Sequence, residues 1–166
     1  HGEDLPVIEA VRLAALEGGV PRALPDTVRT GTDLQFELDF RVRRPSQGVN
    51  VGAAIFRTDN VLAATFNSLL EGLPPVTAPG RHRCRLSLPD LRLSEGEYTV
   101  VGYLFDEHGL HMYDHRQHDR NLIVSLDQNH PGLVRLHHRF EVQALGPLPA
   151  AAGDAAPSTQ RVPGKA

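Results

Sequence analysis

The sequence predicts an all-β protein, an antiparallel β-sandwich of about eight or nine strands. Three observations favour this fold class: apolar and polar residues alternate along most of the chain, glycine and proline clusters separate the alternating segments, and no stretch has a helical period. A strand with this alternation buries one face only. Two sheets packed face to face would satisfy that requirement.

The clearest strand is predicted in "DLQFELDFRVRR", residues 33–44. Every second residue is apolar and should face the core. These inward residues are Leu34, Phe36, Leu38, Phe40 and Val42. The residues between them are charged or polar, which indicates a half-buried strand.

Two further strands follow the same rule. In "VNVGAAIFR", Val49, Val51, Ala53 and Ile55 should face inward, and Asn50, Gly52, Ala54 and Phe56 outward. In "RHRCRLSLP", Cys84 lies on the inward row with Leu86 and Leu88. We therefore interpret Cys84 as a small core residue and not as a nucleophile.

The remaining strands are predicted from shorter alternating segments. Their ranges are 7–16, 61–67, 97–105, 111–114, 120–126 and 133–142. Turn signals separate the strands: "EGGVPRALPD", "RPSQG", "TDN", "EGLPPVTAPG", "SEGE", "DEHG" and "QNHPG". From Ala144 the composition changes to alanine and proline, which bury too little surface to offset the entropy of ordering. We expect a sandwich domain over residues 1–143 and a flexible tail over 144–166.

A tyrosine identifies the type of sandwich. Leu93, Gly96 and Tyr98 form the spacing L-x-x-G-x-Y at the start of a strand, typical of the tyrosine corner of immunoglobulin-like domains. There the phenol bonds to nearby upstream backbone, so Tyr98 should be structural. Strand alternation then directs Tyr103 to the opposite face.

Composition excludes several function classes. A net charge of -3 and a pI near 6.3 do not suit a nucleic-acid-binding protein, and no apolar run is long enough to span a bilayer. The single cysteine excludes an intrachain disulfide and makes a reducing compartment the simpler expectation. The chain starts at His1 and not at methionine, so we expect it to be part of a longer polypeptide.

The most unusual local composition is "DEHGLHMYDHRQHDR", residues 106–120. Its His108, His111, His115 and His118 stand among Asp106, Asp114 and Asp119, and imidazole and carboxylate groups both ligate zinc. The spacing matches no recognised metal motif, so a polar loop and a glycan-binding loop stand beside a metal-binding loop as alternatives. No nucleophile elbow surrounds Ser68, Ser87 or Ser125, and we expect no catalytic residues, no cofactor and no metal.

Four stretches, in order, resemble a known family: "TGTDLQFELDFRV", "VNVGAAIFRTDNVLAATFNS", "LRLSEGEYTVVGYLFD", and "DRNLIVSL" followed by "GLVRLHHRFEV". Over residues 7–142 the chain is similar to the C-terminal domain of Wzt, the ATP-binding subunit of the ABC transporter that exports O-antigen polysaccharide. The family usually closes on a tryptophan, where Phe140 stands here. No phosphate-binding loop is present, so an ATPase part would lie outside this chain.

The resemblance implies an immunoglobulin-like or jelly-roll sandwich that binds the exported O-antigen through its non-reducing end and couples binding to export. It also implies a non-catalytic homodimer, a transporter membrane subunit as partner, a role in lipopolysaccharide biosynthesis, and a cytoplasmic location peripheral to the inner membrane. The alternating segment "LVRLHHRFEV" would be a liability as an exposed edge strand, which also favours pairing or exchange between protomers. In it His138 is interpreted as a core or interface residue.

Sugars present apolar C–H faces and many hydroxyls, so a glycan site needs an aromatic platform ringed by planar polar groups. We predict the site around Tyr103, with small outward residues leaving a shallow trough. The candidates are Tyr103, Phe105, Phe56, Asn50, Asn67, His111, Tyr113, His115 and Arg139. The alternative is a structural or dimerisation sandwich in which the same aromatics cover a protein interface.

Overall fold

The computed structural model describes residues 4–44, 48–125 and 132–149. The chain divides after Leu136 into two units. The first unit holds every strand of the described residues, and residues 137–149 of the second form none. Nowhere in the described ranges is there a helix long and apolar enough to cross a membrane.

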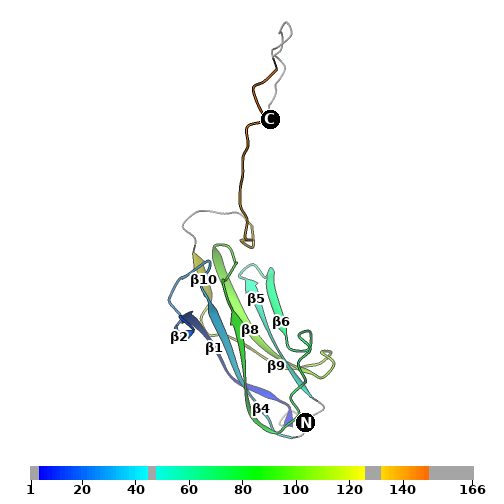
Figure 1. Ribbon diagram of the computed structural model, residues 1–166. Helices are drawn as coiled ribbons and strands as arrows, with labels where there is room; N and C mark the ends of the chain where they lie inside the picture. The colour runs from blue at the N-terminus through cyan, green and yellow to red at the C-terminus, as the bar shows by residue number, and fades with distance from the viewer. Residues whose placement is uncertain (1–3, 45–47, 126–131, 150–166) are drawn as a thin grey trace. The chain divides into compact units, whose positions relative to one another are not determined.

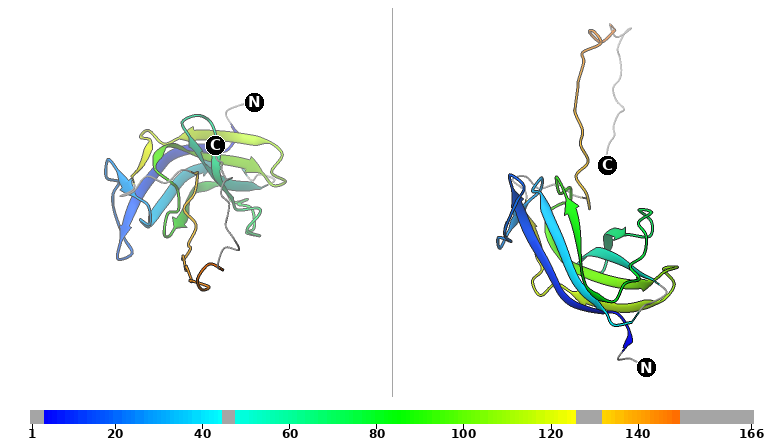
Figure 2. Two further views of the ribbon diagram at one scale, coloured as in Figure 1. Left: turned by 90° about the horizontal axis from the view of Figure 1, so that it is seen from above. Right: turned by 60° about the horizontal axis from the view of Figure 1, so that its bottom comes forward.

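The strands of the first unit form two layers, which Figures 1 and 2 show as two packed sheets. The four-stranded sheet has the order β2-β1-β4-β7, and all its pairs are antiparallel. Its strands are β1 (Val7–Glu17), β2 (Val20–Ala23), β4 (Leu34–Val42) and β7 (Gly80–Leu88).

The six-stranded sheet has the order β3-β10-β8-β5-β6, and β9 pairs with β8 beside β10. Every pair is antiparallel except β3 and β10, which run parallel. Its strands are β3 (Val28–Arg29), β5 (Val49–Arg57), β6 (Leu62–Asn67), β8 (Gly96–Asp106), β9 (Met112–Gln117) and β10 (Leu122–Ser125). The predicted β-sandwich is confirmed.

The core lies between the two sheets and consists of the predicted inward rows. All five apolar residues of β4 are buried, as are Val49, Val51, Ala53 and Ile55 of β5. The sheets approach closely at Gly102, where an added Cβ would lie 2.5 Å from the Leu38 side chain and 3.2 Å from Phe36. A residue without a side chain is needed at this point of contact.

Tyr98 is the structural tyrosine, as its spacing predicts. Its ring is fully buried, and its hydroxyl donates a hydrogen bond of 2.8 Å to the carbonyl oxygen of Ser94. The phenol therefore fixes the corner that leads into β8 while its ring fills the core.

The predicted strands differ from the structure in three places. The short strand β3, which pairs in parallel with β10, was not predicted. The segment "EGGVPRALPD" is not only a turn, because Gly18 and Gly19 make a two-residue hairpin that pairs Glu17 with Val20 and starts β2. The strand predicted over 133–142 is wrong for the single chain: Val134 makes an isolated bridge with Leu93, and residues 135–149 form no strand. Alternation favours the extended conformation, but a strand also requires a neighbour to pair with.

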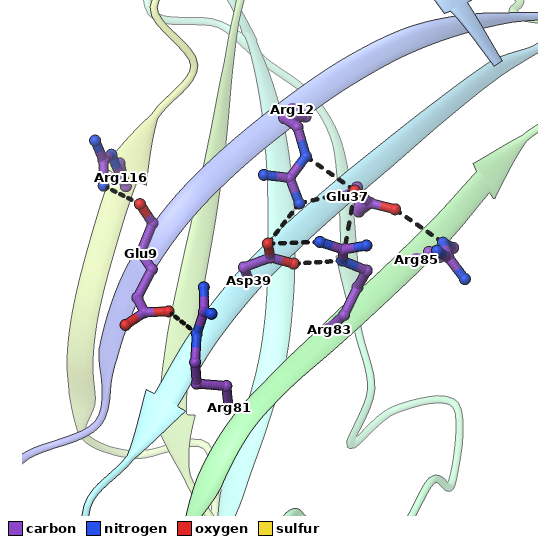
Figure 3. Close-up of polar contacts among 8 residues, drawn as sticks. All are labelled: Glu9, Arg12, Glu37, Asp39, Arg81, Arg83, Arg85 and Arg116. Carbon is purple, nitrogen blue, oxygen red and sulfur yellow. Dashed lines mark hydrogen bonds and ion pairs between the residues drawn. The ribbon is translucent and has the colours of Figure 1, made fainter.

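The outward face of the four-stranded sheet carries a network of ion pairs (Figure 3). Asp39 on β4 accepts hydrogen bonds from Arg83 on β7 at 2.6 and 2.8 Å and from Arg12 on β1 at 2.6 Å. Glu37 lies between Arg12 and Arg85, with nitrogen–oxygen distances of 2.8 Å to each. Three strands are thus linked across their solvent face.

This network predicts that acid weakens the fold. Hydrogen bonds from Arg83 outweigh burial and, with those from Arg12, hold the pKa of Asp39 well below its ordinary value of 3.8. The stabilisation is therefore complete above that value and is lost as the pH falls below it. Between pH 5 and pH 2 we expect the free energy of unfolding to drop by about 1–2 kcal/mol from this residue, after allowing for solvent screening.

The measurement is urea unfolding at several pH values for the wild-type protein and for Asp39→Asn. The variant should be less stable near neutral pH, and its stability should depend less steeply on pH. Parallel curves for the two proteins would show that Asp39 does not carry this pH dependence.

Candidate functional site

The outward face of the six-stranded sheet brings four sequence-distant residues into one row. The register pairs Asn67 on β6 with Gly52 on β5, Gly52 with Tyr103 on β8, and Tyr103 with His115 on β9. Directly paired residues point to the same side of a sheet. Because Tyr98 points into the core, this row faces away from it.

Three rings of this face lie against one another. The Tyr103 and Phe105 rings are inclined by 21° with centroids 5.7 Å apart, and the Tyr103 and His115 rings by 26° with centroids 6.3 Å apart. Burial raises the pKa of the Tyr103 phenol above its ordinary value of 10, so the hydroxyl is a neutral donor and acceptor at physiological pH. This three-ring group is called the aromatic stack below.

The predicted trough over Gly52 is filled by a ring of the stack. A Cβ added to Gly52 would lie 3.1 Å from Cε2 of Phe105 and 3.0 Å from the carbonyl oxygen of Phe66. The Phe105 ring therefore rests against the Gly52 backbone. Gly52 positions the stack. Together with Asn67 it also lines a cavity of about 290 Å³, described below.

A second row runs parallel to the first and was not predicted as part of the site. It joins Thr65, Ala54, Val101 and Gln117 across the same four strands. Its polar ends, Thr65 and Gln117, stand next to Asn67 and His115 of the first row. Alternation along β6 and β9 could have identified both, once the pairing of those strands was known.

Asn50 is not available to a ligand, which corrects its place in the predicted rim. It is fully buried, donates from Nδ2 to the carbonyl oxygen of Asp106 at 2.9 Å, and accepts from Oγ of Ser68 at 3.3 Å. Outward alternation alone does not reveal that a neighbouring turn covers a side chain. Asn50 ties the last residue of β8 to Ser68, which follows β6.

Two predicted aromatics lie outside the aromatic stack. Phe56 pairs with Thr99 on the same face, four residues along β5 from Gly52, which places it about 13 Å from the first row. Tyr113 lies at a β-bulge in β9, between the residues that pair with Leu104 and Phe105 of β8, and it packs against the core. The structure therefore separates both from Tyr103.

The structure places the remaining predicted polar residues, Asn67, His111 and Arg139, in three different settings. Asn67 accepts a hydrogen bond from the backbone of Leu69 through Oδ1 at 2.9 Å, so Oδ1 is engaged in the turn. His111 is exposed in the turn before β9. Arg139 belongs to the second unit, so its place in the glycan site stays a prediction.

The histidine-rich loop is organised by a carboxylate. Asp106 accepts hydrogen bonds from the backbone of Leu110 at 2.7 Å and of His111 at 3.2 Å. Burial raises the pKa of Asp106, but these backbone donors outweigh it and hold the pKa below its ordinary value. Within the described ranges, no three His, Cys, Asp or Glu side chains come close enough to hold a metal ion, so the geometry gives the metal-binding alternative no support.

A hollowed region lies where both sheets end, between the edge strands β6 and β7. It comprises two mainly apolar cavities of about 290 and 370 Å³, which share Phe66 and Ser87 and are called the edge groove below. Cys84 lines it, and burial raises the pKa of the Cys84 thiol. The cysteine is thus a protonated packing residue at the groove wall.

Comparison with known proteins yields one family. The family model described as "Wzt C-terminal domain" matches residues 7–136. A crystal structure of the C-terminal domain of wzt is similar with a TM-score of 0.70 at 19% identity, covering 86% of this chain and 87% of that one. At this identity the structural likeness establishes the fold alone.

Other matches are more distant. A Niemann-Pick type C2 protein from Japanese carpenter ant has a TM-score of 0.49 at 7% identity, covering 73% of this chain and 93% of that one. A β-glucuronidase from glycoside hydrolase family 2 has a TM-score of 0.47 at 11% identity, covering 68% of this chain and 12% of that one. No curated protein sequence matches the chain.

Proposed function

Because the chain belongs to the Wzt C-terminal domain family, a family of non-catalytic β-sandwich domains, we propose that it binds the polysaccharide that the O-antigen transporter exports. Binding would couple recognition of the glycan to export by the assembled transporter. The partners on this proposal are the O-antigen polysaccharide and the transporter's membrane subunit. The location is cytoplasmic, at the inner membrane.

The aromatic stack is the observation that carries this proposal. Its rings offer the apolar surface that sugar C–H faces require, and Asn67, Thr65, His115 and Gln117 supply planar or hydroxyl hydrogen-bonding groups at both ends of the rows. The stack is only three rings wide, with centroids 5.7 and 6.3 Å apart. A short platform suits a few sugar units, such as the non-reducing end of the chain.

Saturation-transfer NMR with purified O-antigen polysaccharide tests the proposal. We expect signal transfer to glycan protons, strongest for the terminal residues. An unrelated neutral polysaccharide of the same length serves as the control. If neither polymer receives signal, the domain has no glycan site, and the alternative of a structural or dimerisation sandwich holds.

We also propose that the protein is a homodimer in which the segment 136–142 of one copy covers an apolar surface of the other. In that segment one alternating row holds Leu136, His138, Phe140 and Val142 and the other holds His137, Arg139 and Glu141, and Phe140 and Val142 are 86% and 93% exposed. The edge groove offers a matching apolar surface between two edge strands, β6 and β7, that lack a further partner among the described residues. Binding of the segment 136–142 in the edge groove of the other copy would cover its exposed apolar side chains and the unpaired edges of β6 and β7.

The dimer is tested by sedimentation of the wild-type protein and of Phe140→Glu at tens of micromolar. A charge at the apolar row should weaken self-association about tenfold or more, as expected for a central interface aromatic. Leu148→Glu, an equally exposed leucine beyond the segment, is the matched control and should sediment as the wild type. Wild-type protein that stays monomeric would contradict the proposal, as would an unchanged Phe140→Glu.

A further inference from the structure

The most exposed charged groups on the outward face of the four-stranded sheet are arginines. Three carboxylates, Glu9, Glu37 and Asp39, have side chains between 12% and 23% exposed. The five arginines that contact them are 40–74% exposed. These are Arg12, Arg41, Arg81, Arg83 and Arg85. The face therefore has an excess of two positive charges, whereas the chain as a whole carries -3.

The arginines of β7 are held in one orientation by their own acids (Figure 3). In each, Nε donates to a carboxylate: Arg81 to Glu9 at 2.7 Å, Arg83 to Asp39 at 2.6 Å, and Arg85 to Glu37 at 2.8 Å. Arg83 also donates from one terminal nitrogen, Nη2, to Asp39 at 2.8 Å. Anchoring through Nε restricts each guanidinium and leaves Nη1 and the outer N–H of Nη2 directed away from the anchoring carboxylate. Part of the ordering entropy that binding normally costs is thus already lost in the free protein.

These three arginines also have a regular spacing. They occupy alternate positions of one strand, so their Cα atoms are about 7 Å apart. An extended polypeptide with a carboxylate at every second residue has the same repeat. Guanidinium and carboxylate groups pair well, because the planar fork donates two parallel hydrogen bonds to the two oxygens.

We propose that the row Arg81–Arg83–Arg85 is a docking surface for an acidic, extended segment of a partner protein. The outward residues of β1, β4 and β7 include no aromatic ring, so the face lacks the platform that a sugar requires. The row also has no apolar side chain between its arginines to enter a bilayer. Charge and spacing are its only recognition features. The surface is separate from the aromatic stack, so this inference does not depend on glycan binding.

An arginine row at a sheet edge also discourages aggregation, and such a role would need no partner. The two explanations differ in the geometry that they require. Protection from aggregation needs only charge, whereas docking needs guanidinium groups that are held in one orientation at a fixed spacing.

The test measures fluorescence anisotropy of a labelled ten-residue peptide with glutamate at every second position and threonine between, at low salt. A peptide of the same composition with its glutamates in one block is the reference. We expect the alternating peptide to bind about fivefold more tightly, and Arg81→Lys/Arg85→Lys to reduce that binding about fivefold. The lysines keep the positive charge but cannot donate two parallel hydrogen bonds to one carboxylate. Circular dichroism checks that the variant is folded.

A second pair of variants separates the site from general electrostatics. Arg81→Gln/Arg85→Gln should abolish the preference for the alternating peptide. Arg22→Gln/Arg44→Gln removes the same charge at matched exposure, 62% and 72% against 74% and 59%, and should leave the preference intact.

Three results would overturn the proposal. They are equal affinity for the two peptides, equal weakening by the two glutamine pairs, and full binding by the lysine variant. Tighter binding to vesicles of phosphatidylcholine with one-third phosphatidylserine than to the peptide would also overturn it, in favour of a lipid surface.

Discussion

Replacing Tyr98 by alanine should lower the free energy of unfolding by about 3–5 kcal/mol, as is usual for a large aromatic removed from a core. The ring is fully buried between the sheets, and its hydroxyl holds the Ser94 carbonyl at 2.8 Å. Small domains are stable by only about 5–15 kcal/mol, so the variant should lose a large share of the total stability. Urea unfolding followed by circular dichroism measures the loss.

Tyr98→Phe separates the two contributions of this residue. It keeps the ring and deletes one hydrogen bond, so we expect a loss of about 1–2 kcal/mol. If Tyr98→Ala were as stable as the wild type, Tyr98 would not be the anchor of the corner that leads into β8. Equal losses for the two variants would assign the whole effect to the hydroxyl.

Tyr103→Ala should reduce affinity for the exported polysaccharide at least tenfold while leaving the melting temperature within a few degrees of the wild type. Stacking contacts of sugars with an aromatic side chain depend on its ring, and Tyr103 is the central ring of the stack, between Phe105 and His115. The residue is only partly buried and lies outside the core. Calorimetric titration and thermal unfolding provide the two measurements.

Phe56→Ala is the matched control, because Phe56 lies on the same face of β5 and β8 but about 13 Å from the first row. It should bind like the wild type. Unchanged affinity in Tyr103→Ala would remove the aromatic stack from the site. A large drop in melting temperature together with loss of the dimer would instead assign Tyr103 to a protein interface.

Local patterns were sufficient to predict most of the fold. Strict alternation identified β4, β5 and β7 and the direction of their side chains, because burial on one face leaves a period of two in the sequence. The spacing of Leu93, Gly96 and Tyr98 identified the corner, because that hydrogen bond is local. The family resemblance is also confirmed, over residues 7–136.

The sequence patterns did not predict features that depend on which strands pair, or on a turn that covers a side chain. The glycine pair before β2 was an available hairpin signal, but Val20–Ala23 is exposed and has no apolar alternation. Asn50 follows the outward rule and is nevertheless buried, because the turn after β6 covers it. The rows that join Thr65 to Gln117 depend on the register of four strands, which no single segment of sequence contains.

The central claim is that the outward face of the six-stranded sheet recognises the exported glycan. The most direct measurement is a map of amide chemical-shift changes in the labelled protein during titration with O-antigen polysaccharide. We predict saturable changes that are largest at Tyr103, Phe105 and His115, with little change along β7. Changes confined to the β7 arginines or to the edge groove, or no saturable change at any amide, would contradict it.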